Sequence, residues 1–494
     1  MAQPNAAAIK AAYATALKQQ NAGQFGAAFK AYEAIVQAAP RLAEAHYQMG
    51  RVALELYRPR TAVVALTKAA RLKSNVPEIL RAKAEAEVAA SDQAQALKTL
   101  GKLVSLRPSD PAPKVEQAKV LQQLGRFDEA LNIIGKLLKK QPEDGQLYRL
   151  LTFPRRMQAD DPVIPQMQAL WDQQLSDQSR IDLGYALAKT MGDLGQHDQV
   201  FTYLDAANAL QCKQAAPNMD GVEDEAAQLI AAQQGAKLPA LAAPQAPSPI
   251  FITGMPRSGT TLVERIFGRH PQVGMAEEIA AGFRLARATL GNNPKAMAPL
   301  SQAKPEMLSA VAQRMRVSLA ETSSQQGAQF VTDKSIMTYL VMPALAAAMP
   351  DARFVVVRRD PRDVALSIYR NHFADGTHRY STDLEAIARQ IVVFERCIDA
   401  FRDTLGDRMI EVRYEDLVDD PDTQIPRLIT GAGLDWNDAC LHPEDAEGAV
   451  RTLSLGQVRA PVYKSSKGGW RRFETEMQPF IKTYEALTHV PFRD

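Results

Sequence analysis

A short segment in the middle of the chain combines the residue types that bind anions. Residues 249–267 read PIFITGMPRSGTTLVERIF, which is an apolar strand pattern, a loop bounded by Gly254 and Gly259, and an apolar helical stripe. Such a loop directs backbone N–H groups and the positive end of a helix toward a phosphate. The spacing fits the P-loop pattern G-x4-G, but Thr260 stands where that pattern has lysine, and Arg257 lies inside the loop. The segment therefore predicts anion binding without the P-loop lysine, and a purely structural turn is the alternative.

A second pattern of this kind occupies residues 352–367. Its apolar run, 354–357, predicts a buried strand, and Arg359 lies just beyond the end of that strand. The N-cap, N1 and N3 positions of a following helix fit Asp360, Pro361 and Asp363. Ser367 then falls on the first or second turn, so Arg359 and Ser367 are able to converge on one further phosphate. Ion pairs between the arginines and the two aspartates are the competing interpretation.

The two patterns together resemble the sulfotransferases that use 3′-phosphoadenosine-5′-phosphosulfate (PAPS). Residues 254–261 are similar to the 5′-phosphosulfate loop of that family. Residues 359–367 are similar to its 3′-phosphate motif, in which an arginine and the serine eight residues later hold the phosphate. The following stretch 270–278, HPQVGMAEE, resembles the tyrosylprotein sulfotransferase-like branch. The resemblance covers about 249–475.

The resemblance implies roles for individual residues, with PAPS as the sulfuryl donor and no metal. Glu278 stands where that branch has its general base and would accept the proton of the acceptor hydroxyl, with Glu277 ranked second. Lys334 and Arg257 would stabilise the negative charge that develops on the leaving group. The residues implied to bind PAPS are Arg257, Ser258, Gly259, Thr260, Thr261, Arg359, Ser367, Tyr414, Ser466, Lys467 and Gly468.

Several of these assignments have plainer alternatives, and the sequence also departs from the branch. Glu278 also fits a solvated helix-start carboxylate, and Lys334 fits an ion pair with Asp333 or another carboxylate. Tyr414 fits the hydrophobic core. Where the branch has an arginine two residues after its base, this chain has Ala280, so a preference for acidic acceptor sequences is not carried over. Gly468 replaces a serine of that branch, and the reserve histidines are His372 and His378.

The N-terminal part of the chain repeats with a period of 34 residues. That spacing separates the small residues Ala28, Ala62, Ala96 and Ala130. Four positions after each alanine comes a bulky residue on the same helical face: Tyr32, Leu66, Leu100 and Ile134. The period resembles the tetratricopeptide repeat. The units lie near 9–42, 43–76, 77–110 and 111–144, and degenerate repeats continue to 212. A peptide-binding surface and a plain scaffold both remain open for this region.

Composition limits the remaining possibilities. A length of 494 residues exceeds what one hydrophobic core organises, so two or more domains are expected. With 58 basic and 56 acidic residues the formal charge is +2, which argues against recruitment of nucleic acid by the field of the whole chain. No run approaches the roughly 18 apolar residues of a membrane span, and the first residues do not resemble a signal peptide. Three dispersed cysteines fit a reduced compartment, so we expect a cytoplasmic protein.

We therefore predict a tetratricopeptide α-superhelix (1–212), an Ala/Pro-rich linker (213–248) and a P-loop-like α/β sulfotransferase domain with a central parallel sheet (249–494), as in the bacterial tetratricopeptide-repeat sulfotransferases that this arrangement resembles. The predicted activity is PAPS-dependent sulfuryl transfer to an acceptor hydroxyl. A peptide or protein tyrosine, presented by the repeat surface, is favoured over the hydroxyl of a small metabolite, a glycan or a lipid. The alternatives are an interaction scaffold with an inactive sulfotransferase-like domain and a P-loop nucleotide kinase, against which the missing loop lysine argues.

Overall fold

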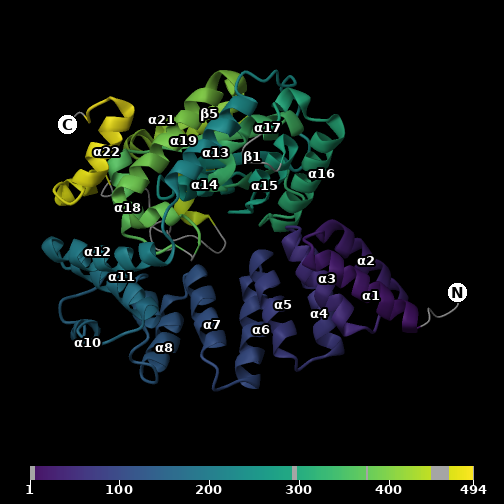
Figure 1. Cartoon of the computed structure of the whole chain (residues 1–494), viewed down its shortest axis with the longest axis horizontal. Coiled ribbons are helices and arrows are strands. Elements are labelled where there is room, and N and C mark those ends of the chain that lie inside the picture. The colour runs from purple at the N-terminus through teal and green to yellow at the C-terminus, as the bar shows by residue number, and fades with distance from the viewer. Residues whose placement is uncertain (1–5, 292–296, 374–375, 447–466, 493–494) are drawn as a thin grey trace.

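The chain folds into a helical superhelix followed by an α/β domain, and the two lie against each other (Figure 1). A computed structural model describes residues 6–291, 297–373, 376–446 and 467–492. The helices of the superhelix are α1 (Ala6–Asn21), α2 (Phe25–Ala38), α3 (Ala43–Glu55), α4 (Pro59–Leu72), α5 (Pro77–Ala89), α6 (Gln93–Leu106), α7 (Ala112–Gln123), α8 (Phe127–Leu138), α9 (Gly145–Thr152), α10 (Val163–Trp171), α11 (Asp177–Asp193) and α12 (His197–Gln214). The predicted fold class is confirmed.

The repeat period appears directly in the helix boundaries. The second helices of four successive pairs begin 34 residues apart, at Phe25, Pro59, Gln93 and Phe127. The four repeat alanines are fully buried, and the bulky residues that follow them are at most 4% exposed. A small residue on one helix lets the neighbouring helix approach, and the bulky residue fills the next gap. The 34-residue pattern in the sequence is thus the packing pattern of the superhelix.

The α/β domain is built on a five-stranded parallel sheet with the order β2-β3-β1-β4-β5. Its strands are β1 (Ser248–Gly254), β2 (Val273–Met275), β3 (Phe330–Asp333), β4 (Arg353–Arg358) and β5 (Met409–Arg413). Every residue of the central strand β1 is buried, as expected for a parallel strand covered on both faces. Because all strands run the same way, the turns that leave β1, β3 and β4 lie at one edge of the sheet.

Helices cover both faces of the sheet. The helices of this domain are α13 (Met219–Gln233), α14 (Thr260–Gly268), α15 (Ala281–Arg287), α16 (Pro305–Thr322), α17 (Met342–Ala348), α18 (Pro361–Tyr369), α19 (Leu384–Leu405), α20 (Tyr414–Asp419), α21 (Pro421–Gly431) and α22 (Gln478–Thr488). Phe251 and Phe354 face a core shared with α17 and α19, whereas Ile252 and Val355 face α14 and α21. Helix α13 lies inside the predicted linker and packs on α19. The domain boundaries stay a prediction.

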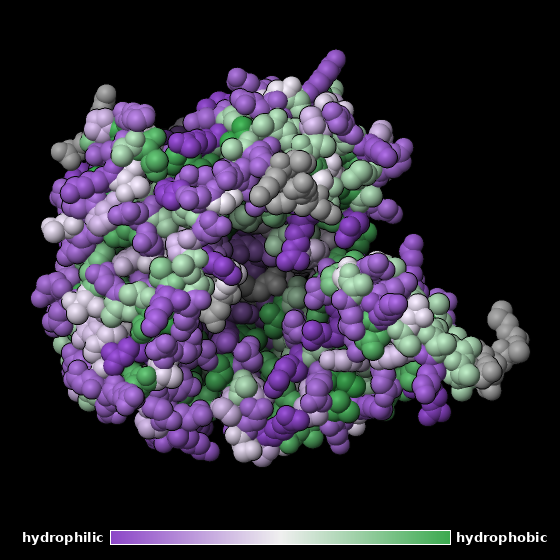
Figure 2. Space-filling view, in the orientation of Figure 1, coloured by the Kyte–Doolittle hydropathy of each residue, from purple (hydrophilic) through white to green (hydrophobic). Residues whose placement is uncertain are grey.

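Among the described residues, the superhelix contacts the α/β domain at two separate places. The first contact lies near the start of the superhelix. There the Glu321 carboxylate of α16 accepts hydrogen bonds from Arg58 Nε (3.1 Å), Thr61 N (2.9 Å) and Thr61 Oγ1 (2.6 Å) at the beginning of α4. Near its end, α12 packs against the segment that follows α18. Figure 2 shows a hollow between the superhelix and the α/β domain on this face of the molecule.

The repeat core predicts a sharp contrast between two positions of α4. Leu66 is fully buried, whereas Val64, two residues earlier on the same helix, is 71% exposed. Leu66→Ala should lower the free energy of unfolding of the superhelix by about 2–5 kcal/mol, because it removes apolar contacts and leaves a cavity. Val64→Ala is the matched control and should change it by less than about 0.5 kcal/mol. Urea denaturation followed by circular dichroism measures both, and equal effects would contradict the packing described here.

Candidate active site

The loop between β1 and α14 has the geometry of an anion cradle. Arg257 has a φ of +70° and Gly259 a φ of +108°, so the backbone turns sharply before α14 begins at Thr260. A Cβ atom at position 259 would lie 2.5 Å from the Tyr414 ring, which only glycine tolerates. Ser258 is 2% exposed, and its Oγ has no hydrogen-bond partner among the described residues. The loop therefore brings a serine hydroxyl, the Arg257 guanidinium and the start of a helix together.

The second motif meets this loop directly. Arg257 Nε donates to Ser367 Oγ (3.2 Å), and Arg359 Nη1 donates to the Arg257 carbonyl oxygen (3.0 Å). The Arg359 guanidinium also stacks over the Tyr414 ring, 4.6 Å from its centroid. Asp360 caps α18 by accepting from Arg362 N (2.8 Å), with Pro361 at its first position, as the sequence indicated. The structure thus brings both predicted phosphate motifs to one place.

A carboxylate and an ammonium group lie side by side at the ends of β2 and β3. Lys334 Nζ donates to Glu278 Oε1 (2.8 Å); the lysine side chain is 1% exposed and the glutamate side chain 48% exposed. Burial alone would lower the pKa of Lys334, but the Glu278 and Glu264 carboxylates outweigh it and raise the pKa to about 12. Lys334 therefore keeps its positive charge at neutral pH, while Glu278 remains open to solvent. The predicted ion pair of Lys334 with an acidic residue exists, but its partner is the proposed base.

The C-terminal segment reaches the same helix α18. The Asp363 carboxylate accepts from Gly468 N (2.7 Å) and from Trp470 N (3.1 Å), and the Trp470 side chain is buried beneath the Arg362 guanidinium. Lys467 Nζ pairs with Asp419 at the end of α20. These contacts place the predicted residues Lys467 and Gly468 next to α18 and α20. Ser466 and the other residues of 461–466 lie outside the described part of the chain.

Comparison with known proteins agrees with this geometry. Residues 249–438 match the family described as "Sulfotransferase family", and residues 87–152 match "Tetratricopeptide repeat". Residues 249–438 form a sulfotransferase-family domain. The family resemblance of the sequence is confirmed, and tetratricopeptide repeats precede the domain.

Individual relatives are distant. An uncharacterized protein of Aquifex aeolicus is 25% identical over 381 residues, which are 74% of this chain and 49% of the relative. Protein-tyrosine sulfotransferase 1 of Danio rerio is 27% identical over 219 residues, 42% of this chain and 59% of that enzyme. The chain thus spans about half to three fifths of the length of these relatives. Among solved structures, the sulfotransferase domain of the Synechococcus PCC 7002 olefin synthase covers 53% of this chain and is itself covered to 98%, with 18% identity and a TM-score of 0.35.

The sulfotransferase domain contains a buried carboxyl group that the sequence reasoning missed. Glu264 on α14 is 3% exposed, and its Oε1 accepts from Glu277 N and from Thr332 Oγ1, both at 3.0 Å. Burial raises the pKa of Glu264 to about 7, a shift that the charge of Lys334 opposes. One signal was available: Glu264 stands four residues after Thr260, on the helix face below the anion-binding turn. It links α14 to the turn that carries Glu278.

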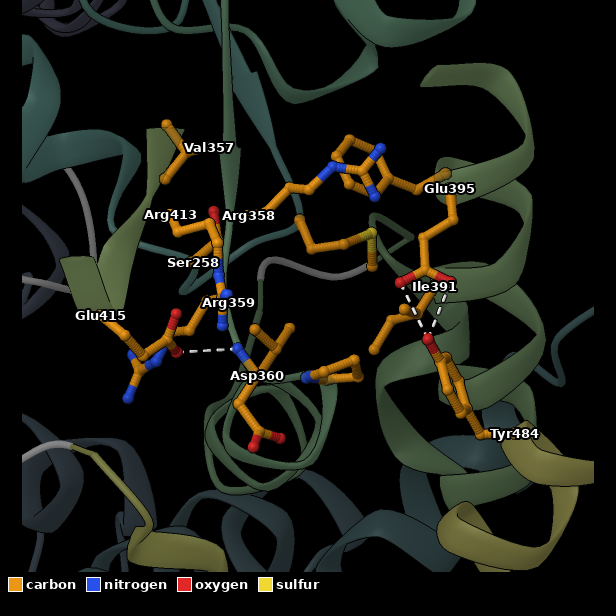
Figure 3. Close-up of a pocket in the computed structure, with 14 residues that line it drawn as sticks. Ser258, Val357, Arg358, Arg359, Asp360, Ile391, Glu395, Arg413, Glu415 and Tyr484 are labelled. Atoms are coloured by element: carbon orange, nitrogen blue, oxygen red, sulfur yellow. Dashed lines mark hydrogen bonds between the residues drawn. The ribbon is translucent and has the colours of Figure 1, made fainter. Parts of the chain in front are cut away.

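Figure 3 shows a pocket at the carboxyl end of β4, which is lined by both charged and apolar side chains. Ser258 and Arg359 line it, so it borders the anion cradle, whereas Arg257 and Lys334 are not among its lining residues. On one side Glu415 Oε1 accepts from Asp360 N (2.9 Å). The residues that close the opposite side are Glu395 and Tyr484, whose hydroxyl contacts both carboxylate oxygens at 2.9 Å.

The reserve histidine His378 lies on the Glu278 side of the site. Its ring packs between Phe373 (4.9 Å between centroids) and Tyr380 (5.7 Å). Burial lowers the pKa of His378, and the nearby Glu278 carboxylate opposes that shift only in part. A neutral imidazole and two aromatic rings therefore lie near the proposed base. No described helix is long and apolar enough to cross a membrane, and the described residues contain no group of three or more His, Cys, Asp or Glu able to hold a metal ion.

The burial of Glu264 predicts a pH-dependent stability. Its pKa is about 7 in the folded chain against 4.5 for an unburied glutamate, so between these pH values the folded state holds a proton that the unfolded chain has released. Wild-type stability should therefore fall, relative to Glu264→Gln, as the pH rises through this window. Urea denaturation of both proteins at pH 5 and pH 8 measures the difference. A gap that stays constant with pH would show that Glu264 is not held as described.

Proposed function

We propose that the α/β domain transfers a sulfuryl group from PAPS to an acceptor hydroxyl. The observation that carries the proposal is the meeting of the two anion-binding motifs, with Arg257 Nε 3.2 Å from Ser367 Oγ, while the Lys334–Glu278 pair lies at the end of the neighbouring parallel strand β3. A structural strand–turn–helix has no need for two arginines and a buried lysine at one edge of a sheet, because burying cations is costly unless their charge is used or paired. The match of residues 249–438 to the sulfotransferase family supports the same activity.

The residues of the cradle fit a nucleotide with phosphate groups at two positions. The loop 254–261 would hold the 5′-phosphosulfate through backbone N–H groups, the Ser258 hydroxyl and the Arg257 guanidinium. Arg359 and Ser367 would hold the 3′-phosphate. The buried Ser258 Oγ, without a partner among the described residues, is the kind of donor that an oxyanion would satisfy. PAPS would supply the sulfuryl group, and the chain supplies the groups around it.

Glu278 and Lys334 have different roles: Glu278 acts as the general base, and Lys334 stabilises negative charge. Glu278 is half exposed, so an acceptor hydroxyl is able to reach it and give up its proton. Lys334 is buried and stays protonated, so its charge stabilises the negative charge on the leaving phosphate oxygen in a region from which water is excluded. Arg257 shares that role from the loop that follows β1. Because base and cation are 2.8 Å apart, both lie within reach of one reacting group.

We propose a peptide or protein tyrosine as the acceptor, with a small hydroxyl compound as the second candidate. The tetratricopeptide repeats favour a polypeptide, because such superhelices bind extended chains on their surface. The similarity to an enzyme named protein-tyrosine sulfotransferase 1 points the same way. An inactive interaction scaffold would have no use for Glu278 and Lys334 in their present geometry, and a P-loop kinase would need a lysine at Thr260.

The assignment of the base is tested by Glu278→Gln. This change should leave the affinity for 3′-phosphoadenosine-5′-phosphate (PAP) unaltered and reduce turnover by roughly 10²–10⁴-fold, because the amide no longer accepts a proton. Turnover is measured with labelled PAPS and the acceptor that a screen of tyrosine peptides and phenols identifies. Glu277→Gln is the matched variant at the adjacent carboxylate and should remain active. Full activity of Glu278→Gln, or loss of activity only in Glu277→Gln, would contradict the assignment.

A further inference from the structure

The last helix of the superhelix holds the C-terminal end of α18. Asn208 on α12 is fully buried, and its Nδ2 donates to the carbonyl oxygen of Tyr369 (3.1 Å), the last residue of α18. The carbonyl groups of a final helical turn have no partner inside the helix, so this amide satisfies one of them. The orientation of the amide is fixed in turn, because Asn208 Oδ1 accepts from the hydroxyl of Tyr185 on α11 (2.5 Å).

The Tyr369 side chain makes a second connection to α12. Its hydroxyl donates to Asp205 Oδ1 (2.7 Å), one helical turn before Asn208. Its ring stacks on Phe201, 5.6 Å between centroids, and is 6% exposed. Phe201 also packs on Phe473 of the C-terminal segment, 5.4 Å away. Tyr369 is therefore held by a backbone bond, a side-chain bond and a ring contact, all from one helix of the superhelix.

The same short helix carries groups of the nucleotide cradle. Ser367, which accepts from Arg257, stands two residues before Tyr369. Asp363, which binds the backbone of Gly468 and Trp470, lies in the first turn of α18. Because α18 is a rigid helix of nine residues, a shift of its C-terminal end moves the Ser367 hydroxyl with it.

We propose that Asp205 and Asn208 are positioning residues of the nucleotide site. Through them, helix α12 of the repeat superhelix holds α18, and with it Ser367, in place. The inference rests on the proposed function, since it concerns the same PAPS site. It assigns the end of the superhelix a second role besides any acceptor binding. By linkage, a nucleotide that needs α18 in place also stabilises α12, and a partner that displaces α12 weakens nucleotide binding by the same factor.

The second contact between the domains provides a matched control. Glu321 on α16 accepts hydrogen bonds from Arg58 and Thr61 at the start of α4, and in the described part of the chain no hydrogen bond or ion pair joins it to α18. Replacing Glu321 therefore weakens the attachment of the superhelix without touching the helix that carries Ser367. If weaker attachment of the superhelix in general lowered the affinity for PAP, this variant would show the loss. If the loss depends on the position of α18, this variant would not show it.

Calorimetric titration of the full chain with PAP tests the inference. Asn208→Ala and the milder Tyr369→Phe, which removes only the hydroxyl that binds Asp205, should each weaken PAP binding by about tenfold, within the usual range of coupling between sites. Glu321→Ala should stay within about twofold of wild type, because distant sites act independently. Thermal unfolding of each variant identifies any that fails to fold. If Asn208→Ala does not fold, the PAP affinity of Tyr369→Phe, which lacks only a single oxygen, decides the test.

Two outcomes would overturn the inference. One is wild-type PAP affinity in both folded α12–α18 variants. The other is an equal loss in Glu321→Ala, which would assign the effect to domain attachment. Wild-type protein that does not bind PAP would instead overturn the proposed function, and the inference with it. Hydrogen exchange gives an independent readout: PAP should slow exchange in α12 (197–214) and leave α2 (25–38) unchanged.

Discussion

The pairing of β1 with β4 is the constraint on which the rest of the site depends. Five register pairs hold the two strands side by side, from Ile250 with Arg353 to Gly254 with Val357. Both strands end at the same edge of the sheet, and each continues through a turn into a helix. The first turn supplies Arg257 and Ser258, and the second supplies Arg359. Two turns that are far apart in sequence thereby become one anion-binding surface, with Tyr414 from the end of β5 packed against Arg359 and Gly259.

Charge balance is the second requirement of such a site. A buried ammonium group is stable only with carboxylates near it, and Lys334 has Glu278 and the buried Glu264 as neighbours. Glu264 also accepts from Glu277 N, so the same carboxyl group helps to fix the turn that presents the proposed base. Chemistry and folding are therefore linked here, because the buried carboxyl group near Lys334 also shapes the turn that carries Glu278.

Local sequence patterns predicted the elements, and long-range packing determined what they contact. The 34-residue alanine spacing predicted the superhelix correctly because each repeat packs on its neighbour in the chain. The start of α18 at Asp360 and Pro361 was predictable because helix capping acts within one helical turn. The contact between Asn208 and Tyr369 joins residues 161 positions apart, and no local periodicity records it. The pairing of Lys334 with Glu278 rather than with its neighbour Asp333 depends on the register of β2 and β3 in the same way.

The central claim is that two separate phosphate sites lie on one nucleotide-binding edge, and comparison of PAP with 5′-AMP by calorimetry tests it most directly. The two ligands differ only in the 3′-phosphate. Wild type should bind PAP at least about a hundredfold more tightly, since charge-assisted hydrogen bonds from Arg359 and Ser367 are each worth roughly 1.5–3 kcal/mol, or about 3–6 kcal/mol together. Arg359→Ala should lower that preference by about tenfold or more while leaving the affinity for 5′-AMP unchanged. Equal affinity of wild type for PAP and 5′-AMP would contradict the account.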